Sequence, residues 1–279
     1  MKHLAWQIGA SACGHEDMTR ELFEEYQKAQ IGFMEISLCF NCRGLEVIKE
    51  IYSRYNVKNV RKYAEETGVD IWSYHLPFDH NFVNPASFDA AVRKQTIEID
   101  NMMIEDAAEV GAKYAIIHAS GEPIEDSDRA DSMKYAKETI LTLNETAKKN
   151  GIVLAVECLP RTCLGKNSSE VLELVEGDDA LKVCFDVNHL LCESHKDFVK
   201  NIGSKIETLH ISDYDFVDER HWLPGKGKID WEELVSLLKE IGYNEVFMNE
   251  VACKYKNSGN DEWPTYDELR ETNEKVLIR

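Results

Sequence analysis

Short apolar runs recur along the entire chain, and charged segments separate them. Eight of these runs are candidate β-strands: Leu4–Gly9, Phe33–Leu38, Asp70–Leu76, Lys113–Ala119, Ile152–Leu159, Leu181–Val187, Ile206–Ser212 and Glu245–Val251. The separating segments place apolar residues at helical intervals, as Leu234, Leu237, Leu238 and Ile241 do. The runs themselves are continuously apolar rather than alternating, which is typical of parallel strands that helices cover. The pattern therefore predicts a strand followed by a helix, repeated along the chain.

Several predicted helices end at a glycine that leads into the next strand, as at Gly68, Gly111, Gly151 and Gly242. So regular an alternation favours an α/β fold in which eight parallel strands close into a (βα)8 TIM barrel. An open, doubly wound sheet is the alternative, but its glycine-rich phosphate turn is missing after the first run. We find no linker or change of composition, and we expect residues 1–279 to form a single TIM-barrel domain.

The composition restricts the partners of the chain. Its 32 Lys and Arg residues face 51 Asp and Glu residues, which gives a formal net charge of −19. That charge argues against nucleic acids and acidic membranes, which clustered basic residues would have to bind. No apolar run is long enough to span a bilayer. The first residues lack the features of a secretory signal, so we expect a cytoplasmic protein with reduced cysteines. For Cys39 and Cys42 we expect a structural or pocket-lining role rather than a redox role.

Metal-capable side chains end the third to the eighth candidate strand in turn. They are His75, His118, Glu157, Asp186, His210 and Glu250. Active sites of (βα)8 barrels lie at the carboxyl ends of the strands, so we expect these side chains to converge. His75 or His118 taken singly could be an ordinary buried histidine, but as part of this series we expect both to contact the substrate. Three carboxylates buried together would repel each other unless a cation held them, and with one imidazole they suit Mn²⁺ best, with Mg²⁺, Co²⁺ or Zn²⁺ as alternatives.

The longest irregular segment, Tyr214 to Ile229, is a candidate functional loop. It contains His221, Trp222 and Lys226, for which we expect contacts with a substrate, although its Pro-Gly pair could also be a simple turn. His189 follows Asp186 by three positions and is a further candidate for substrate contact. Asp213 follows His210 by three positions, and we expect it to orient a neighbouring histidine.

Taken in order, these motifs resemble the xylose isomerase-like barrel superfamily of sugar isomerases and epimerases. The resemblance rests on His75-Leu76-Pro77, His118, Glu157, Asp186-Val187-Asn188-His189, His210-Ile211-Ser212-Asp213, the segment from His221 to Gly227, and Glu250. It implies one divalent metal ion held by Glu157, Asp186, His210 and Glu250, with His189 at the substrate oxygens. It also implies a homodimer or a homotetramer.

Members similar to ketose 3-epimerases use two glutamates on opposite sides of the sugar, and Glu157 and Glu250 match them. One would remove a proton from the carbon beside a carbonyl, and the other would return it while the metal stabilises the enediolate. Return to the opposite face gives epimerisation, return to the neighbouring carbon gives isomerisation, and loss of a β-hydroxyl gives dehydration, as in inosose dehydratases. We expect a neutral keto-sugar or polyol as substrate, because no phosphate cradle accompanies the motifs.

Two other functions stay open at this point. Endonuclease IV, which shares this barrel, holds three zinc ions and cuts DNA. Its ligands resemble His75, His118, Glu157, His189, Glu219 and His221, with Glu219 in place of an aspartate, but the net charge of −19 disfavours DNA. A non-catalytic sugar-binding protein would have no use for two opposed glutamates. The number of bound metal ions separates the sugar enzyme from the nuclease.

Overall fold

The computed structural model describes residues 6–38, 45–255 and 259–277, in which eight parallel strands form one sheet. The strands are β1 (Ile8–Ser11), β2 (Phe33–Ile36), β3 (Asp70–His75), β4 (Tyr114–Ile117), β5 (Val153–Glu157), β6 (Lys182–Asp186), β7 (Ile206–His210) and β8 (Phe247–Asn249). The α-helices are α1 (Arg20–Lys28), α2 (Leu45–Arg54), α3 (Val57–Thr67), α4 (Ala90–Val110), α5 (Arg129–Asn150), α6 (Ser168–Leu174), α7 (His195–Ile202), α8 (Trp231–Glu240) and α9 (Tyr266–Leu277). The predicted parallel α/β fold is confirmed.

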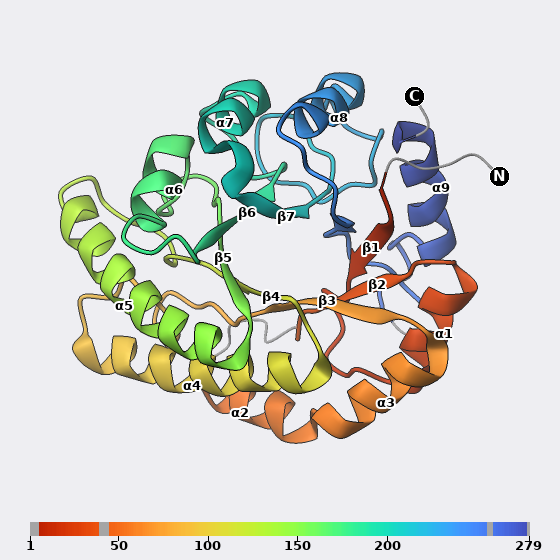
Figure 1. Cartoon of the computed structure of the whole chain (residues 1–279), viewed down its shortest axis with the longest axis horizontal. Helices are drawn as coiled ribbons and strands as arrows, with labels where there is room; N and C mark the ends of the chain where they lie inside the picture. Colours follow the sequence, from red (N-terminus) through yellow and green to blue (C-terminus); the bar gives the residue numbers. More distant parts are fainter. Residues whose placement is uncertain (1–5, 39–44, 256–258, 278–279) are drawn as a thin grey trace.

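The sheet curls into a barrel whose strands follow the order of the sequence. Each strand pairs with its neighbour in the chain, and β1 pairs with β8. The last junction, between β7 and β8, is made just past β7, where Ile211 donates to the Met248 carbonyl (2.8 Å) and accepts from the Glu250 amide (3.0 Å). Figure 1 shows the helices as an outer ring around these strands. The predicted (βα)8 barrel is therefore confirmed.

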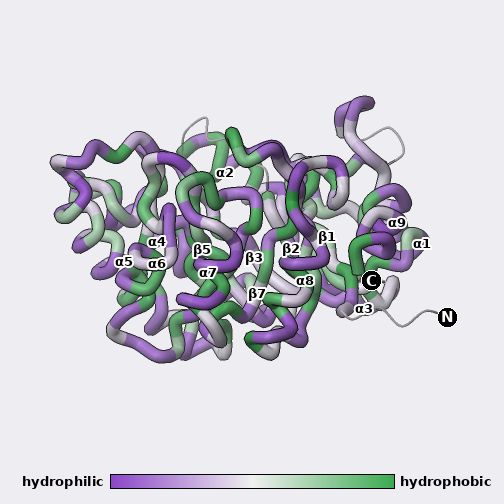
Figure 2. The backbone as a smooth tube through the Cα atoms, turned by 90° about the horizontal axis from the view of Figure 1, so that it is seen from above, coloured by the Kyte–Doolittle hydropathy of each residue, from purple (hydrophilic) through white to green (hydrophobic). Residues whose placement is uncertain are grey.

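Local sequence signals define the helix ends. Gly68, Gly111 and Gly151 adopt the left-handed conformation directly after α3, α4 and α5, and this conformation favours glycine because it lacks a Cβ. The outer helices change colour between hydrophilic and hydrophobic every few residues in Figure 2, as helices do when one face is buried. The last helix, α9, packs beside α1 through the rings of Tyr26 and Tyr266, whose centroids lie 4.5 Å apart.

An apolar cluster fills the amino-terminal part of the barrel interior. Its buried members are Trp72, Tyr114, Ile116, Ala155, Cys184, Val246 and Met248. Gly9 contributes to this tight packing, because a Cβ at this position would come within 2.6 Å of the Met248 methyl group. The Trp72 indole donates to Thr208 Oγ1 across the barrel (3.1 Å). Beyond this apolar cluster, the carboxyl ends of the strands carry charged side chains.

The observed elements differ from the predicted ones mainly at their ends. The first strand, Ile8–Ser11, continues beyond the predicted end at Gly9, because Gly9, Ala10 and Ser11 pair with β2. Leu4 and Ala5 of the predicted run lie outside the described residues. The other strands are one to four residues shorter than the apolar runs. Two helices rather than one separate β2 from β3. Within the described ranges, no helix combines the length and apolarity that crossing a membrane requires.

Candidate metal centre and active site

Four side chains from neighbouring strands meet at the carboxyl end of the barrel. Glu157, Asp186 and His210 are the last residues of β5, β6 and β7, and Glu250 follows β8 directly. One donor atom from each lies within 4.8 Å of the others. The parallel register explains the convergence, because Asp186 pairs directly with His210 and adjacent strands therefore end at one level. The sequence prediction named these four residues as metal ligands, and the structure brings them together.

The charges of these groups are strongly coupled. Burial raises the pKa of Asp186 well above its usual value, and the Glu250 carboxylate nearby acts in the same direction. Burial also acts to raise the pKa of Glu157, but the imidazoles of His210 and His118 outweigh it and hold that pKa well below its usual value. For Glu250, His210 and His221 outweigh burial in the same way and lower the pKa to about 2. A cation at this position would favour the ionised form of all three carboxyl groups.

The hydrogen bonds at this centre leave donor atoms available for a cation. Asp186 Oδ1 accepts from the amide of Asn188 (2.6 Å), whereas its Oδ2 is buried without a hydrogen-bond partner among the described residues. Glu250 Oε2 is in the same situation. Buried carboxylate oxygens of this kind are rare unless they are paired or bind a metal. With three carboxylates and one imidazole, this donor set fits a divalent metal ion.

The two carboxylate oxygens of Glu157 face different histidines. Oε1 lies 3.1 Å from His210 Nδ1, inside the group of four. Oε2 lies 3.3 Å from His75 Nε2 and 3.1 Å from His118 Nε2. The Nδ1–H of His75 donates to the Leu76 carbonyl (2.8 Å), which orients that ring. His75, His118 and Glu157 thus form a second group that could hold a metal ion.

The pKa values of the two histidines beside Glu157 Oε2 move in opposite directions. Burial acts to lower the pKa of His75, but the hydrogen bond and charge of Glu157 raise it to about 9. For His118 the burial effect prevails and lowers the pKa. One carboxylate oxygen therefore stabilises one imidazolium, and the adjacent ring stays neutral. The ring of Phe78 stacks on this second histidine, with centroids 3.9 Å apart.

A third group lies on the loop side of the centre. His189 Nδ1 faces the Cys158 carbonyl (3.0 Å), and its Nε2 faces Glu219 Oε2 (3.3 Å). His189 lowers the pKa of Glu219 to about 2. The His221 ring lies near His189, and its Nδ1 is 3.1 Å from the Glu250 carbonyl. His189, Glu219 and His221 are also close enough to share an ion.

Of the predicted substrate residues, all but His75 line two adjoining depressions. A pocket of about 290 Å³ contains His118, His189, His221 and Glu250, together with Glu219. Trp222 and Lys226 instead line a neighbouring groove of about 740 Å³, which also contains His221. The backbone of His221 is left-handed, with φ of 50°, which is uncommon for this residue type and often marks a functional position. His221 therefore stands at the boundary between the pocket and the groove.

Asp213 does not orient a histidine, and that prediction is wrong. Its Oδ1 accepts from the amides of Tyr214 (2.9 Å) and Ile229 (3.2 Å). Its Oδ2 accepts from the Gly225 amide (2.8 Å) and the Trp231 indole (3.0 Å). This fully buried carboxylate thus ties both ends of the long loop together and holds the segment that carries His221. The sequence could not reveal these bonds because most of them join residues more than ten positions apart.

Sequence reasoning missed one charged residue of the site, Glu35, and placed another, Arg161, in a loop at the carboxyl end of the barrel without giving it a role. Glu35 on β2 is fully buried, and its Oε2 lies 2.9 Å from His210 Nε2. Arg161, in the loop after β5, contacts Glu122, Asp218 and Glu219 at the pocket. The signal for Glu35 was an acidic residue inside the apolar run Phe33–Leu38, where an unpaired carboxylate is unfavourable.

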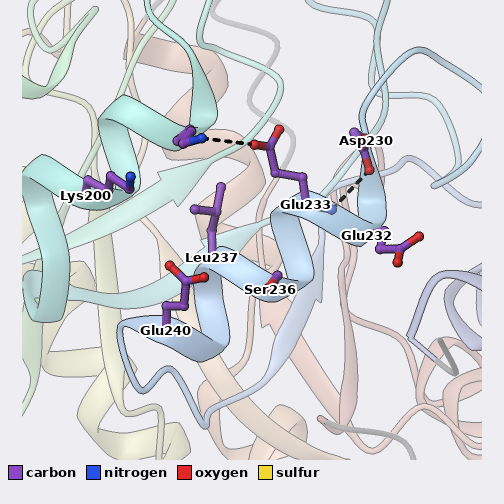
Figure 3. Close-up of a pocket in the computed structure, with 8 residues that line it drawn as sticks. Lys200, Asp230, Glu232, Glu233, Ser236, Leu237 and Glu240 are labelled. Carbon is purple, nitrogen blue, oxygen red and sulfur yellow. Dashed lines mark hydrogen bonds and ion pairs between the residues drawn. The ribbon is translucent and has the colours of Figure 1, made fainter.

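Cys39 and Cys42, for which we expected a structural or pocket-lining role, lie outside the described residues. A surface groove between α7 and α8 is lined mainly by Lys200, Asp230, Glu233 and Glu240, and it contains none of the strand-end residues. Figure 3 shows that these side chains come from the outer helices and the turn before α8.

The chain is similar to several known proteins. The family model of the xylose isomerase-like TIM barrel matches residues 27–272. An uncharacterized protein of Methanocaldococcus jannaschii is 30% identical over 214 residues, which cover 74% of this chain and 71% of that protein. The D-psicose 3-epimerase of Enterocloster bolteae is 24% identical over 249 residues, or 81% of this chain and 76% of the epimerase.

The chain is also similar to a solved structure. The crystal structure of a D-tagatose 3-epimerase-like protein superimposes with a TM-score of 0.79 and 25% identity, and the alignment covers 97% of both chains. The family model spans most of the described barrel, including all four residues of the central group. The chain therefore belongs to the xylose isomerase-like TIM-barrel family, whose members similar to it include sugar epimerases.

Proposed function

We propose that this protein is a divalent-metal-dependent epimerase or isomerase of keto-sugars or polyols. The observation that carries the proposal is the convergence of Glu157 and Glu250 with Asp186 and His210 within 4.8 Å. Glu157 comes from β5 and Glu250 from the end of β8, so β6 and β7 separate them around the barrel. They therefore approach a molecule above the centre from different sides, as a two-base proton transfer requires.

Both glutamates are suited to accept a proton. The lowered pKa values of Glu157 and Glu250 keep them ionised at neutral pH. One glutamate, as the carboxylate, would remove the proton from the carbon next to the carbonyl. The other, after taking up a proton from solvent, would deliver that proton to the opposite face, and the first would then release its own proton to solvent. Mn²⁺, which we favour, or another divalent ion would supply Lewis-acid stabilisation of the negative charge that develops on the carbonyl oxygen. His189 and His221 line the pocket, and we assign them hydrogen bonds to substrate oxygens.

The charge around the pocket favours an uncharged substrate. Apart from histidines, Arg161 is the one cationic residue among the described residues that line the pocket. Its guanidinium already contacts Glu122 at 2.7 Å, Asp218 at 2.8 Å and Glu219 at 3.0 Å. A phosphate group would have to displace these carboxylates, whereas hydroxyl groups can share donors and acceptors with them.

Isotope exchange tests the proposal directly. The Mn²⁺-loaded protein would be incubated in D₂O with free keto-sugars, sugar phosphates and inososes, and NMR would follow deuterium at the carbon beside the carbonyl. We expect exchange and an epimer or isomer from a non-phosphorylated sugar. Glu157→Gln and Glu250→Gln, measured with the ion bound, should each lower turnover by a factor of about 10² to 10⁴.

The matched control is Glu232→Gln, which removes an exposed carboxylate on α8 and should leave turnover unchanged. Near-normal turnover by both site variants with the ion bound would contradict the two-base scheme. Loss of water from an inosose without epimer formation would instead identify a dehydratase that uses the same residues.

The second candidate is a zinc phosphodiesterase related to endonuclease IV. It is favoured by the two additional groups, His75 with His118 and Glu157, and His189 with Glu219 and His221. The net charge of −19 disfavours a DNA substrate. Elemental analysis of the purified protein discriminates between the two functions, because one ion per chain supports sugar chemistry and three zinc ions support phosphodiester cleavage.

A further inference from the structure

Glu35 is a buried carboxylate inside the barrel, next to the metal centre. Its side chain lies on β2, is fully buried, and is outside each group of residues that could share an ion. Its Oε2 lies 2.9 Å from His210 Nε2 and 2.7 Å from the Ser73 hydroxyl. Burying a carboxylate is costly unless such partners compensate. The position therefore calls for an explanation beyond packing.

We propose that Glu35 is a positioning residue that fixes the tautomer and the orientation of His210 for metal binding; this rests on the metal dependence in the proposed function. A carboxylate only accepts hydrogen bonds, so the contact with Glu35 requires a proton on His210 Nε2. By the same rule Nδ1, which lies 3.1 Å from Glu157 Oε1, also carries a proton. A bound ion would replace the Nδ1 proton, whereas Glu35 would keep the proton on Nε2. Such carboxylate partners raise the donor strength of metal-bound histidines.

The strand register places Glu35 and His210 for this contact. Met34 pairs with Ile71, but Glu35 pairs with Ser73, so the β2–β3 register shifts by one residue at this point. The β6–β7 register shifts in the same way, since Val183 pairs with Ile206 and Asp186 with His210. Shifts of this kind redirect side chains and often occur near active sites. Here one shift aligns Glu35 with Ser73, and the other aligns His210 with Asp186.

Ser73 fixes Glu35 in turn. Its hydroxyl has one proton, which it donates to Glu35 Oε2, the same oxygen that accepts from His210. The two donors thus hold one carboxylate oxygen between β3 and β7. Since Nδ1 and Nε2 lie on different edges of the imidazole, Glu35 acts through His210 and not as a ligand itself.

The test compares ion affinity among variants. Glu35→Gln keeps the shape of the side chain and removes its charge, and Ser73→Ala removes the donor that holds Glu35. Isothermal titration with Mn²⁺ should give about 10- to 100-fold weaker binding for Glu35→Gln and a smaller loss for Ser73→Ala. The Co²⁺-loaded variants should show shifted absorption bands. Ser132→Ala, which removes a buried hydroxyl on α5, is the matched control and should bind like the wild type.

The ring nitrogens of His210 give a second readout. In Mg²⁺-loaded wild-type protein, the ¹⁵N chemical shifts should identify Nε2 as the protonated atom. In the protein without Mg²⁺, Glu35→Gln should raise the fraction of neutral His210 that carries its proton on Nδ1. Glu35→Asp serves if Glu35→Gln does not fold, because it retains the charge and shortens the reach. Weaker ion binding supports the inference even when no sugar is converted. Binding within twofold of wild type together with an unchanged Co²⁺ spectrum overturns it, even when the protein epimerises a sugar.

Discussion

Buried carboxyl groups occur in two settings in this protein. Glu157 and Glu250 sit among imidazoles, which keep them ionised. Asp100, on α4, is 1% exposed, and neither of its carboxyl oxygens has a hydrogen-bond partner among the described residues. Burial raises its pKa well above the usual value. A buried carboxyl group is therefore kept ionised by imidazoles in one setting and is a source of instability in the other.

Replacing Asp100 should stabilise the protein at alkaline pH. In the unfolded chain an aspartate loses its proton near pH 3.9, whereas folded Asp100 retains it to a higher pH. Over this interval the folded state binds more protons, so the free energy of unfolding falls as the pH rises. Asp100→Asn removes this penalty, and its melting temperature should exceed that of the wild type by about 2 °C or more at pH 8. The difference should shrink at pH 5.

Thermal unfolding at the two pH values measures this effect. Glu105→Gln changes an exposed carboxylate on the same helix, and we expect no such pH-dependent gain from it. A melting temperature of Asp100→Asn that stays equal to wild type at pH 8 would contradict the assignment of Asp100 as a buried, unpaired acid.

One ion pair holds the connection between β5 and α6 in place. Arg129, at the start of α5, contacts Glu170 on α6 through Nε (2.8 Å) and Nη2 (2.7 Å). Arg129 also donates to the carbonyls of Thr162 and Cys163, and Glu170 accepts from the Gly165 amide. These bonds fix the loop that carries Arg161 to the pocket.

Arg129→Ala should lower the free energy of unfolding by about 1.5 to 3 kcal/mol at pH 7, since it breaks charged hydrogen bonds at a site less than one-fifth exposed. Burial acts to raise the pKa of Glu170, but Arg129 outweighs it, and the net pKa is lowered. The contribution is therefore present above the unfolded pKa of about 4.3 and is lost as the pH falls. Urea unfolding should show a smaller gap between wild type and variant at pH 4 than at pH 7.

The control for this pair is Lys137→Ala, which removes an ion pair to Glu176, a side chain that is 72% exposed. Exposed pairs contribute little, so this variant should lose less than about 1 kcal/mol. If both variants lost the same free energy of unfolding, the two-point contact between Arg129 and Glu170 would contribute no more than an exposed ion pair.

The sequence predicts the barrel and the four residues of the central group, because both depend on where apolar runs end. Glu157, Asp186 and His210 each end such a run, and parallel register brings these ends together. The contact between Glu35 and His210 could not be predicted, because Glu35 lies within an apolar run and a one-residue register shift sets its pairing. The role of Asp213 could not be predicted, because its partners lie along a folded loop. Register and loop closure are long-range properties that local patterns do not contain.

The stability of the barrel should depend on the divalent ion that we propose for its carboxyl end. Glu35, Glu157, Asp186 and Glu250 bring four carboxyl groups to one end of the barrel, in a chain of net charge −19. An ion that binds only the folded state stabilises it by about 2.7 kcal/mol at a free concentration of 100 times its dissociation constant. Removal of the ion with EDTA should therefore lower the melting temperature by about 5 °C, and excess Mn²⁺ should restore it.

Variants separate a specific ion effect from a general salt effect. Glu157→Gln removes the carboxylate that faces both His210 and His118, so its melting temperature should respond weakly to Mn²⁺. Glu232→Gln, on the surface of α8, should respond like the wild type. If Mn²⁺ raised the melting temperatures of all three proteins equally, the ion would be acting on the overall negative charge, and the four strand-end residues would not form its binding site. A response confined to wild type and Glu232→Gln would link the stability of the fold to the same carboxylates that we assign to proton transfer.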